Sequence, residues 1–274
     1  MSWELRGKYP EIFNDPVVGK EAKKLFEDAQ ELIAQITEQN ALTAKGVCGI
    51  HPANSTGDDD IQIYTDESRT KLRCTLNMLR QQAKRGQQLP NLCLADFIAP
   101  DTSGVADYIG AFVVTAGIGA EELCRKFEAE HDDYSAILVK AIADRLAEAA
   151  AEWLHERVRR EWWGYAADEA LTNTERIAEK YRGIRPAPGY PACPDHTEKE
   201  KLFSLLNATE HTSVLLTENY AMFPAASVSG WYFSHPASSY FSIGKISADQ
   251  LADYAHRKQW SADEASRWLA PLLD

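Results

Sequence analysis

The 274-residue sequence predicts an α+β fold, a single domain with a mainly antiparallel twisted sheet flanked by long helices. Two observations carry this prediction. Strand-like patterns are dense between residues 46 and 115, whereas residues 132–163 carry the longest helical pattern of the chain. The expected elements follow one another as helix, strands, long helices, strands and helices, which differs from the alternation of a βαβ repeat. We therefore expect one domain over residues 1–274.

The first half of the chain predicts one helix and then the strands of the sheet. Apolar residues recur at three- and four-residue steps from Val18 to Ile36, which is the period of an amphipathic helix. Five later runs have the alternation or the apolar content of strands: residues 46–52, 61–64, 72–76, 92–98 and 108–114. The first two of these runs, joined by a polar turn over residues 54–60, predict an antiparallel hairpin.

Residues 115–122 resemble part of a dinucleotide fingerprint, but only part. Gly117 and Gly119 supply a G-x-G, whereas Glu122 stands where the third glycine is needed and would oppose a pyrophosphate. The sequence favours a tight turn from a strand into a helix at this point. A free-standing nucleotide-dependent enzyme built on this turn remains an alternative.

The second half adds further elements around a proline-rich segment. Three runs are expected to be strands: residues 214–216, 231–233 and 240–243. Three Ser or Thr residues, each followed three positions later by Glu or Gln, predict capping boxes that open helices: Thr197, Ser247 and Ser261.

Residues 185–196, Arg-Pro-Ala-Pro-Gly-Tyr-Pro-Ala-Cys-Pro-Asp-His, predict a stiff irregular loop, called here the proline-rich loop. It contains four of the twelve prolines, so neither a helix nor a central strand can form there. Arg185 offers a fork of donors for a carboxylate or phosphate, Gly189 permits close approach to the backbone, and Tyr190 offers a ring face. These groups suit a small zwitterionic or anionic ligand. A connector that merely crosses the surface has the same composition.

Composition excludes several classes of partner. The formal net charge of −12 argues against nucleic acid, whose binding depends on Lys and Arg. There is no apolar run near 18 residues and no signal-peptide core, so we expect a cytoplasmic protein without a membrane span. The five cysteines never form a C-x-x-C pair, which argues against a disulfide framework and a structural zinc site.

The run from Arg185 to Lys199 resembles the S-adenosylmethionine-binding signature of the activation module of cobalamin-dependent methionine synthase. Five further blocks extend the resemblance, in the same order, over nearly the whole chain: residues 94–100, 107–112, 143–149, 154–159 and 229–236. The resemblance implies a domain that binds S-adenosylmethionine and supports the reductive methylation of inactive cob(II)alamin to methylcobalamin, without making methionine by itself.

On this resemblance we expect ten residues to form the ligand site: Arg185, Pro186, Ala187, Gly189, Tyr190, Ala192, Tyr240, Phe241, Glu148 and Glu179. The guanidinium would hold the ligand's carboxylate, and the small residues would contribute backbone groups. The aromatic rings would face the sulfonium in a cation–π contact of about 0.5 to 2 kcal/mol. The two glutamates are candidates for the ligand's ammonium group.

The resemblance also implies partners. No D-x-H-x-x-G motif is present, so cobalamin would be held by a separate cobalamin-binding module, and flavodoxin or a similar reductase would donate the electron. Asp144, four residues before Glu148 on one helix face, is expected to face a partner, although a solvated acidic stripe has the same pattern. Five basic residues are candidates for docking the reductase: Arg157, Arg159, Arg160, Lys180 and Arg182. A purely interacting scaffold is a further alternative.

Overall fold

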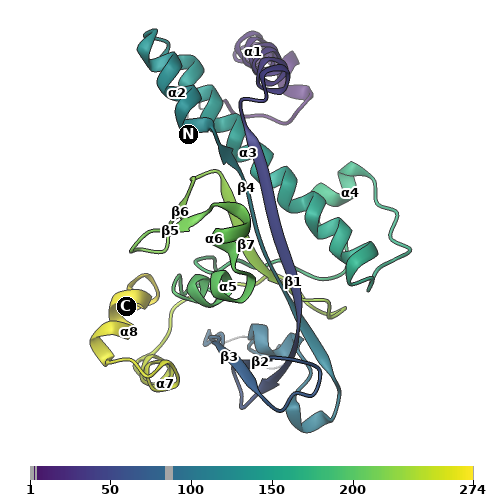
Figure 1. Cartoon of the computed structure of the whole chain (residues 1–274), viewed down its shortest axis with the longest axis vertical. Helices are drawn as coiled ribbons and strands as arrows, with labels where there is room; N and C mark the ends of the chain where they lie inside the picture. The colour runs from purple at the N-terminus through teal and green to yellow at the C-terminus, as the bar shows by residue number, and fades with distance from the viewer. Residues whose placement is uncertain (1–2, 4, 84–88, 274) are drawn as a thin grey trace.

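A five-stranded antiparallel sheet in the order β3-β2-β1-β4-β7 organises the fold (Figure 1). The computed structural model describes residues 3, 5–83 and 89–273. The strands of this sheet are β1 (Thr43–Thr56), β2 (Asp60–Tyr64), β3 (Leu72–Asn77), β4 (Asp107–Ile118) and β7 (Ser227–Tyr232). A separate ribbon pairs β5 (Leu215–Leu216) with β6 (Met222–Phe223). The predicted α+β class with an antiparallel sheet is confirmed.

Helices lie at both ends of the sheet, and α3 covers one face whereas α5 and α6 cover the other (Figure 1). The α-helices are α1 (Gly19–Gln39), α2 (Ala120–Ala129), α3 (Asp133–Arg157), α4 (Asn173–Ile177), α5 (Glu198–Leu206), α6 (Ala208–Thr212), α7 (Ala248–Lys258) and α8 (Ala262–Leu269). A π-helical turn, η4 (Val158–Trp162), continues α3, and short 3₁₀ turns are η1 (Glu11–Asn14), η2 (Leu94–Phe97), η3 (Asp101–Ser103) and η5 (Ala270–Leu272). The two longest predicted helices therefore form where the periodicity placed them.

Strand β4 is buried on both faces, which gives the molecule its layers. Phe112 and Val114 pack with Leu154 of α3, whereas the alternate residues Ala111 and Val113 belong to the main core on the opposite side. That main core also takes in the proline-rich loop, α5 and α6. Because side chains alternate across a strand, one strand separates the two layers.

Helix α3 approaches the sheet through small residues. Ala143 and Ala147 are 1% exposed and pack in one cluster with Ala116 of β4 and Ala226. Alanine at these positions lets the helix backbone come close to the strand.

Two runs predicted as strands adopt other conformations. In the run at 92–98, residues 94–97 form η2, and the backbone N–H of Cys93 donates to Asp96 at 2.8 Å and stabilises this tight turn. Residues 240–243 lie outside every named strand, and Ile243 N donates to Pro191 O at 2.9 Å. The run at 92–98 is apolar because most of it is buried, whereas in the run at 240–243 only Ile243 is buried; such short runs have no period that identifies a strand.

The hairpin turn and two capping boxes also differ from the predictions. Strand β1 continues to Thr56, so the first half of the predicted turn at residues 54–60 belongs to a strand. Thr197 donates its hydroxyl to Asp195, and Ser247 donates to Asp249, so neither side chain caps its helix. The helices themselves begin where predicted. No helix in the described residues is long and apolar enough to cross a membrane.

The predicted strand-to-helix turn is confirmed at Gly119. This residue precedes α2 with φ of 92°, and a Cβ atom there would lie 2.3 Å from the carbonyl oxygen of Ala41. Glycine is required both by the left-handed backbone and by the close approach.

Candidate functional site

The proline-rich loop closes on itself around Gly189. The Gly189 N–H donates to the carbonyl of Cys193 at 2.7 Å, and the Cys193 N–H donates back to Tyr190 at 2.9 Å. Gly189 has φ of 94°, and a Cβ atom there would lie 2.3 Å from the ring of His196. The loop therefore has a defined shape that depends on a glycine at this position.

The start of the loop is fixed to the edge of the sheet. Ile184 and Phe233 exchange backbone hydrogen bonds at 3.1 and 3.0 Å, and Trp231 N donates to Pro186 O at 2.9 Å. This segment thus extends the sheet beyond β7. Proline is tolerated because its carbonyl accepts and no N–H is required.

Helix α7 holds the end of the loop through a buried polar cluster. The carboxylate of Asp195 accepts from the Tyr254 hydroxyl at 2.6 Å and pairs with Lys258 at 2.9 Å. Lys258 also contacts Glu198, the first residue of α5, at 2.6 Å. Burial raises the pKa of Asp195, but the charge of Lys258 and the hydrogen bonds from Tyr254 and Thr197 outweigh it, so the pKa lies below its usual value.

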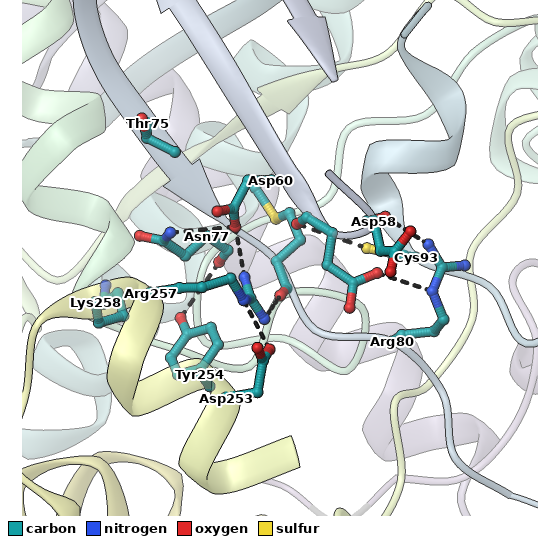
Figure 2. Close-up of polar contacts among 12 residues, drawn as sticks. Asp58, Asp60, Thr75, Asn77, Arg80, Cys93, Asp253, Tyr254, Arg257 and Lys258 are labelled. Atoms are coloured by element: carbon teal, nitrogen blue, oxygen red, sulfur yellow. Dashed lines mark hydrogen bonds and ion pairs between the residues drawn. The ribbon is translucent and has the colours of Figure 1, made fainter. Parts of the chain in front are cut away.

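Helix α7 also contacts β3 and β2, the two strands at the edge of the sheet opposite β7 (Figure 2). Arg257 pairs with Asp60 of β2 at 2.5 Å, and the Tyr254 hydroxyl donates to the carbonyl of Asn77 in β3 at 3.3 Å. Helix α7 therefore connects the sheet edge to the loop.

Arg185, at the start of the loop, contacts α3. Its Nη1 atom lies 2.5 Å from Glu152, 3.4 Å from His155 Nδ1 and 3.4 Å from the Tyr181 hydroxyl. Burial lowers the pKa of His155 well below its usual value, so the imidazole is neutral and can accept this hydrogen bond. The backbone N–H of Arg185 donates to the hydroxyl of Tyr240 at 3.0 Å.

A cavity of about 500 Å³ lies between the loop, α3, β7 and the segment that follows β7. This volume is within the usual range for a small-molecule site. Nine of the ten residues predicted to form the ligand site line the cavity: Glu148, Glu179, Arg185, Pro186, Ala187, Tyr190, Ala192, Tyr240 and Phe241. The structure thus brings together residues that are far apart in the sequence.

Two predicted residues lie elsewhere. Gly189 lines an adjoining cavity of about 440 Å³, between the loop and α8, and contributes to the first cavity through the shape of the loop. Asp144 is exposed on α3 and lines a third cavity beside α2, next to Lys140.

The predicted basic patch needs one correction. Arg159 is fully buried, pairs with Glu169 at 2.8 Å and lies 4.1 Å from the centre of the Tyr181 ring. It therefore supports the core beneath the loop and is not available to a docking partner. Arg160, Lys180 and Arg182 are exposed, and Arg157 is half-buried.

Several polar residues of the cavity were missed by the sequence analysis. Ser229 of β7 is 2% exposed, and its hydroxyl has no hydrogen-bond partner among the described residues. His196 and Lys199 also line the cavity, with Lys199 Nζ 2.8 Å from His196 Nδ1. His196 is the last residue of the loop, Lys199 follows it in α5, and both lie within the run that carries the resemblance, which is the signal that could have identified them.

A metal is not indicated by the described residues, since they contain no group of three His, Cys, Asp or Glu side chains able to hold one. The five cysteines are all free. Burial raises the pKa of the Cys193 thiol well above its usual value, so this loop cysteine is protonated and a weak nucleophile.

Comparison with known proteins gives matches over nearly the whole chain. The family described as "Vitamin B12 dependent methionine synthase, activation domain" matches residues 1–259. Among solved structures, a crystal structure of the MetH reactivation domain bound to AdoHcy is 56% identical and superimposes with a TM-score of 0.96. That match covers 99% of this chain and 83% of the other chain.

Proposed function

Because the chain belongs to the family of vitamin B12-dependent methionine synthase activation domains, we propose that the 500 Å³ cavity binds S-adenosylmethionine as a methyl donor. The observation that carries this proposal is the gathering of nine predicted ligand residues around one cavity. The similar reactivation domain was solved with AdoHcy, S-adenosylhomocysteine, which is this ligand after loss of its methyl group.

The chemistry of the cavity wall suits such a ligand. Arg185 is the cation for the carboxylate, and Glu148 and Glu179 are the acceptors for the ammonium group. Tyr190, 63% exposed, and Tyr240 offer ring faces to the sulfonium. The buried Ser229 hydroxyl gains a hydrogen-bond partner when a polar ligand enters, which removes the cost of leaving it unpaired.

The residues of this chain bind and orient the methyl donor and exclude water; none of them needs to react. Cobalamin, carried by another module, supplies the nucleophile that accepts the methyl group. A reductase would supply the one electron that inactive cob(II)alamin needs. S-adenosylhomocysteine would remain in the cavity as the product. A positioned donor of this kind lowers the barrier mainly through proximity and orientation.

The electron donor in this proposal is flavodoxin or a similar reductase, which must dock on a local patch because the chain carries a net charge of −12. Arg160, Lys180 and Arg182 are the exposed candidates for that patch. The partner that holds cobalamin would dock beside the exposed carboxylate of Asp144.

Calorimetric titration tests the proposed function. S-adenosylmethionine and S-adenosylhomocysteine should each bind one site in the wild-type chain, and Arg185→Ala should weaken binding at least about tenfold, because a charge-assisted hydrogen bond is lost. Arg182→Ala is the matched control, since Arg182 is exposed and outside the cavity. Binding of a dinucleotide alone would favour the nucleotide-dependent enzyme, and no binding of any ligand would favour the scaffold.

A further inference from the structure

Lys199 of α5 is a buried cation without a carboxylate partner among the described residues. It is 6% exposed, lines the 500 Å³ cavity, and has His196 Nδ1 as its hydrogen-bond partner at 2.8 Å. Two other buried cations differ in this respect, because Lys258 pairs with two carboxylates and Arg159 pairs with Glu169.

The burial of the Lys199 ammonium group lowers the stability of the protein when no ligand is bound. Burying an ammonium group without a counter-ion lowers stability, and burial accordingly lowers the pKa of Lys199. The carboxylate of Asp195 partly offsets this, but it is already paired with Lys258. An ammonium group has three N–H donors, and one donates to His196. The other two donors have no hydrogen-bond partner among the described residues, so they are available to an acceptor on the ligand.

The position of Lys199 indicates which part of the ligand it meets. The carboxylate and ammonium of an amino acid share one carbon, so they must bind at one end of the cavity. The backbone N–H of Arg185 donates to the Tyr240 hydroxyl at 3.0 Å, and its Nη1 atom lies 3.4 Å from the Tyr181 hydroxyl, so the end of the cavity that takes the amino-acid part lies beside these two tyrosines. Lys199 instead lies beside His196, whose ring adjoins Gly189 in the proline-rich loop.

We propose that Lys199 determines nucleoside specificity by donating a hydrogen bond to an acceptor atom of the ligand's adenosine, either a ring nitrogen or a ribose oxygen. This inference rests on the proposed function. It places the ligand's adenosine at the end of the cavity where Lys199 lies. His196 positions the ammonium group, since its Nδ1 accepts from Lys199 while its ring packs against Gly189.

The test compares wild type, Lys199→Met and Lys199→Arg by calorimetric titration with S-adenosylhomocysteine. Lys199→Met should weaken binding about tenfold to a hundredfold, the usual effect of losing a charged hydrogen bond, and Lys199→Arg should recover part of the loss. Thermal unfolding without ligand should show Lys199→Met to be at least as stable as wild type, because a buried unpaired charge is removed. If Lys199 had only a structural role, Lys199→Met would lower both the thermal stability of the protein and its affinity for S-adenosylhomocysteine.

Ligand analogues identify the atom involved. Deaza analogues that lack one ring nitrogen, and deoxy analogues that lack one ribose hydroxyl, should bind wild type weakly, and for one of them Lys199→Met should cause no further loss. The inference is overturned if Lys199→Met binds S-adenosylhomocysteine as tightly as wild type, or if its defect disappears only with a decarboxylated ligand. Failure of wild type to bind S-adenosylhomocysteine would instead overturn the proposed function.

Discussion

The Nη1 atom of Arg185 lies 2.5 Å from the carboxylate of Glu152, so the cation proposed to hold the ligand is already paired with an internal acid. Their side chains are 16% and 26% exposed. All the side-chain hydrogen bonds of Arg185 within the described residues leave from Nη1. Because a guanidinium has five donors, Arg185 can keep Glu152 and still offer Nη2 to a carboxylate.

This geometry predicts that Arg185→Lys separates stability from binding. A lysine ammonium can pair with Glu152, but as a single point charge it cannot also present a fork of donors to the ligand. We expect the melting temperature to change little and the affinity for S-adenosylhomocysteine to fall about tenfold or more. Calorimetry and thermal unfolding on the same sample measure both. Wild-type affinity in Arg185→Lys would show that the ligand does not use the fork.

Gly189→Ala should weaken both the fold and the binding site. The new Cβ atom would meet the ring of His196, and alanine disfavours a φ of 94°. We expect the free energy of unfolding to fall by about 1–3 kcal/mol and ligand affinity to fall with it. Urea denaturation and calorimetry are the measurements.

The matched control is Gly104→Ala, because Gly104 has φ of 69° and open space around the new Cβ atom. It should show the backbone cost alone, about 1–2 kcal/mol, with unchanged ligand affinity. An equal loss of stability in the two variants would mean that the His196 contact adds nothing.

Ser229→Ala should have opposite effects on stability and binding. Its buried hydroxyl lacks a partner in the described part of the chain, so removing it should leave the free energy of unfolding unchanged or raise it by up to about 1 kcal/mol. Affinity for S-adenosylhomocysteine should fall if the ligand satisfies this hydroxyl. Chemical denaturation with and without ligand separates the two effects, and unchanged affinity would place the ligand away from β7.

The cavity could largely be predicted from the sequence because its wall is concentrated in one unusual segment. Prolines and a glycine mark residues 185–196 as a shaped loop, and the resemblance adds Glu148 and Tyr240, which no local pattern connects to it. Periodicity likewise identified α1 and α3, since long amphipathic patterns have few alternatives.

The pairings that support the site could not be predicted. Arg185 and Glu152 are 33 positions apart, and their contact depends on how α3 lies against the loop. Asp195 and Lys258 are likewise joined only by the docking of α7. Sequence spacing predicts neighbours within one helix or strand, but it does not give the relative placement of two elements.

Asp195→Asn should reduce stability in a pH-dependent way. At pH 7 it removes a buried carboxylate partner of Lys258, which keeps Glu198 and the Thr197 hydroxyl as partners among the described residues, and the free energy of unfolding should fall by about 3 kcal/mol. The pKa of Asp195 is lowered in the folded state, so its contribution is present above the unfolded value near 4 and is lost as the pH falls through the folded value. The stability difference between wild type and Asp195→Asn should therefore shrink below about pH 4.

Chemical denaturation of both proteins between pH 3 and pH 7 measures this difference, with Asp253→Asn as the control. Asp253 lies on the same helix and pairs with Arg257, but its side chain is 57% exposed, so its loss should cost less than about 1 kcal/mol. A difference between wild type and Asp195→Asn that stays constant down to pH 3 would contradict the assigned pairing. It would mean that α7 is held to the proline-rich loop by packing and hydrogen bonds, with little contribution from the charge of Asp195.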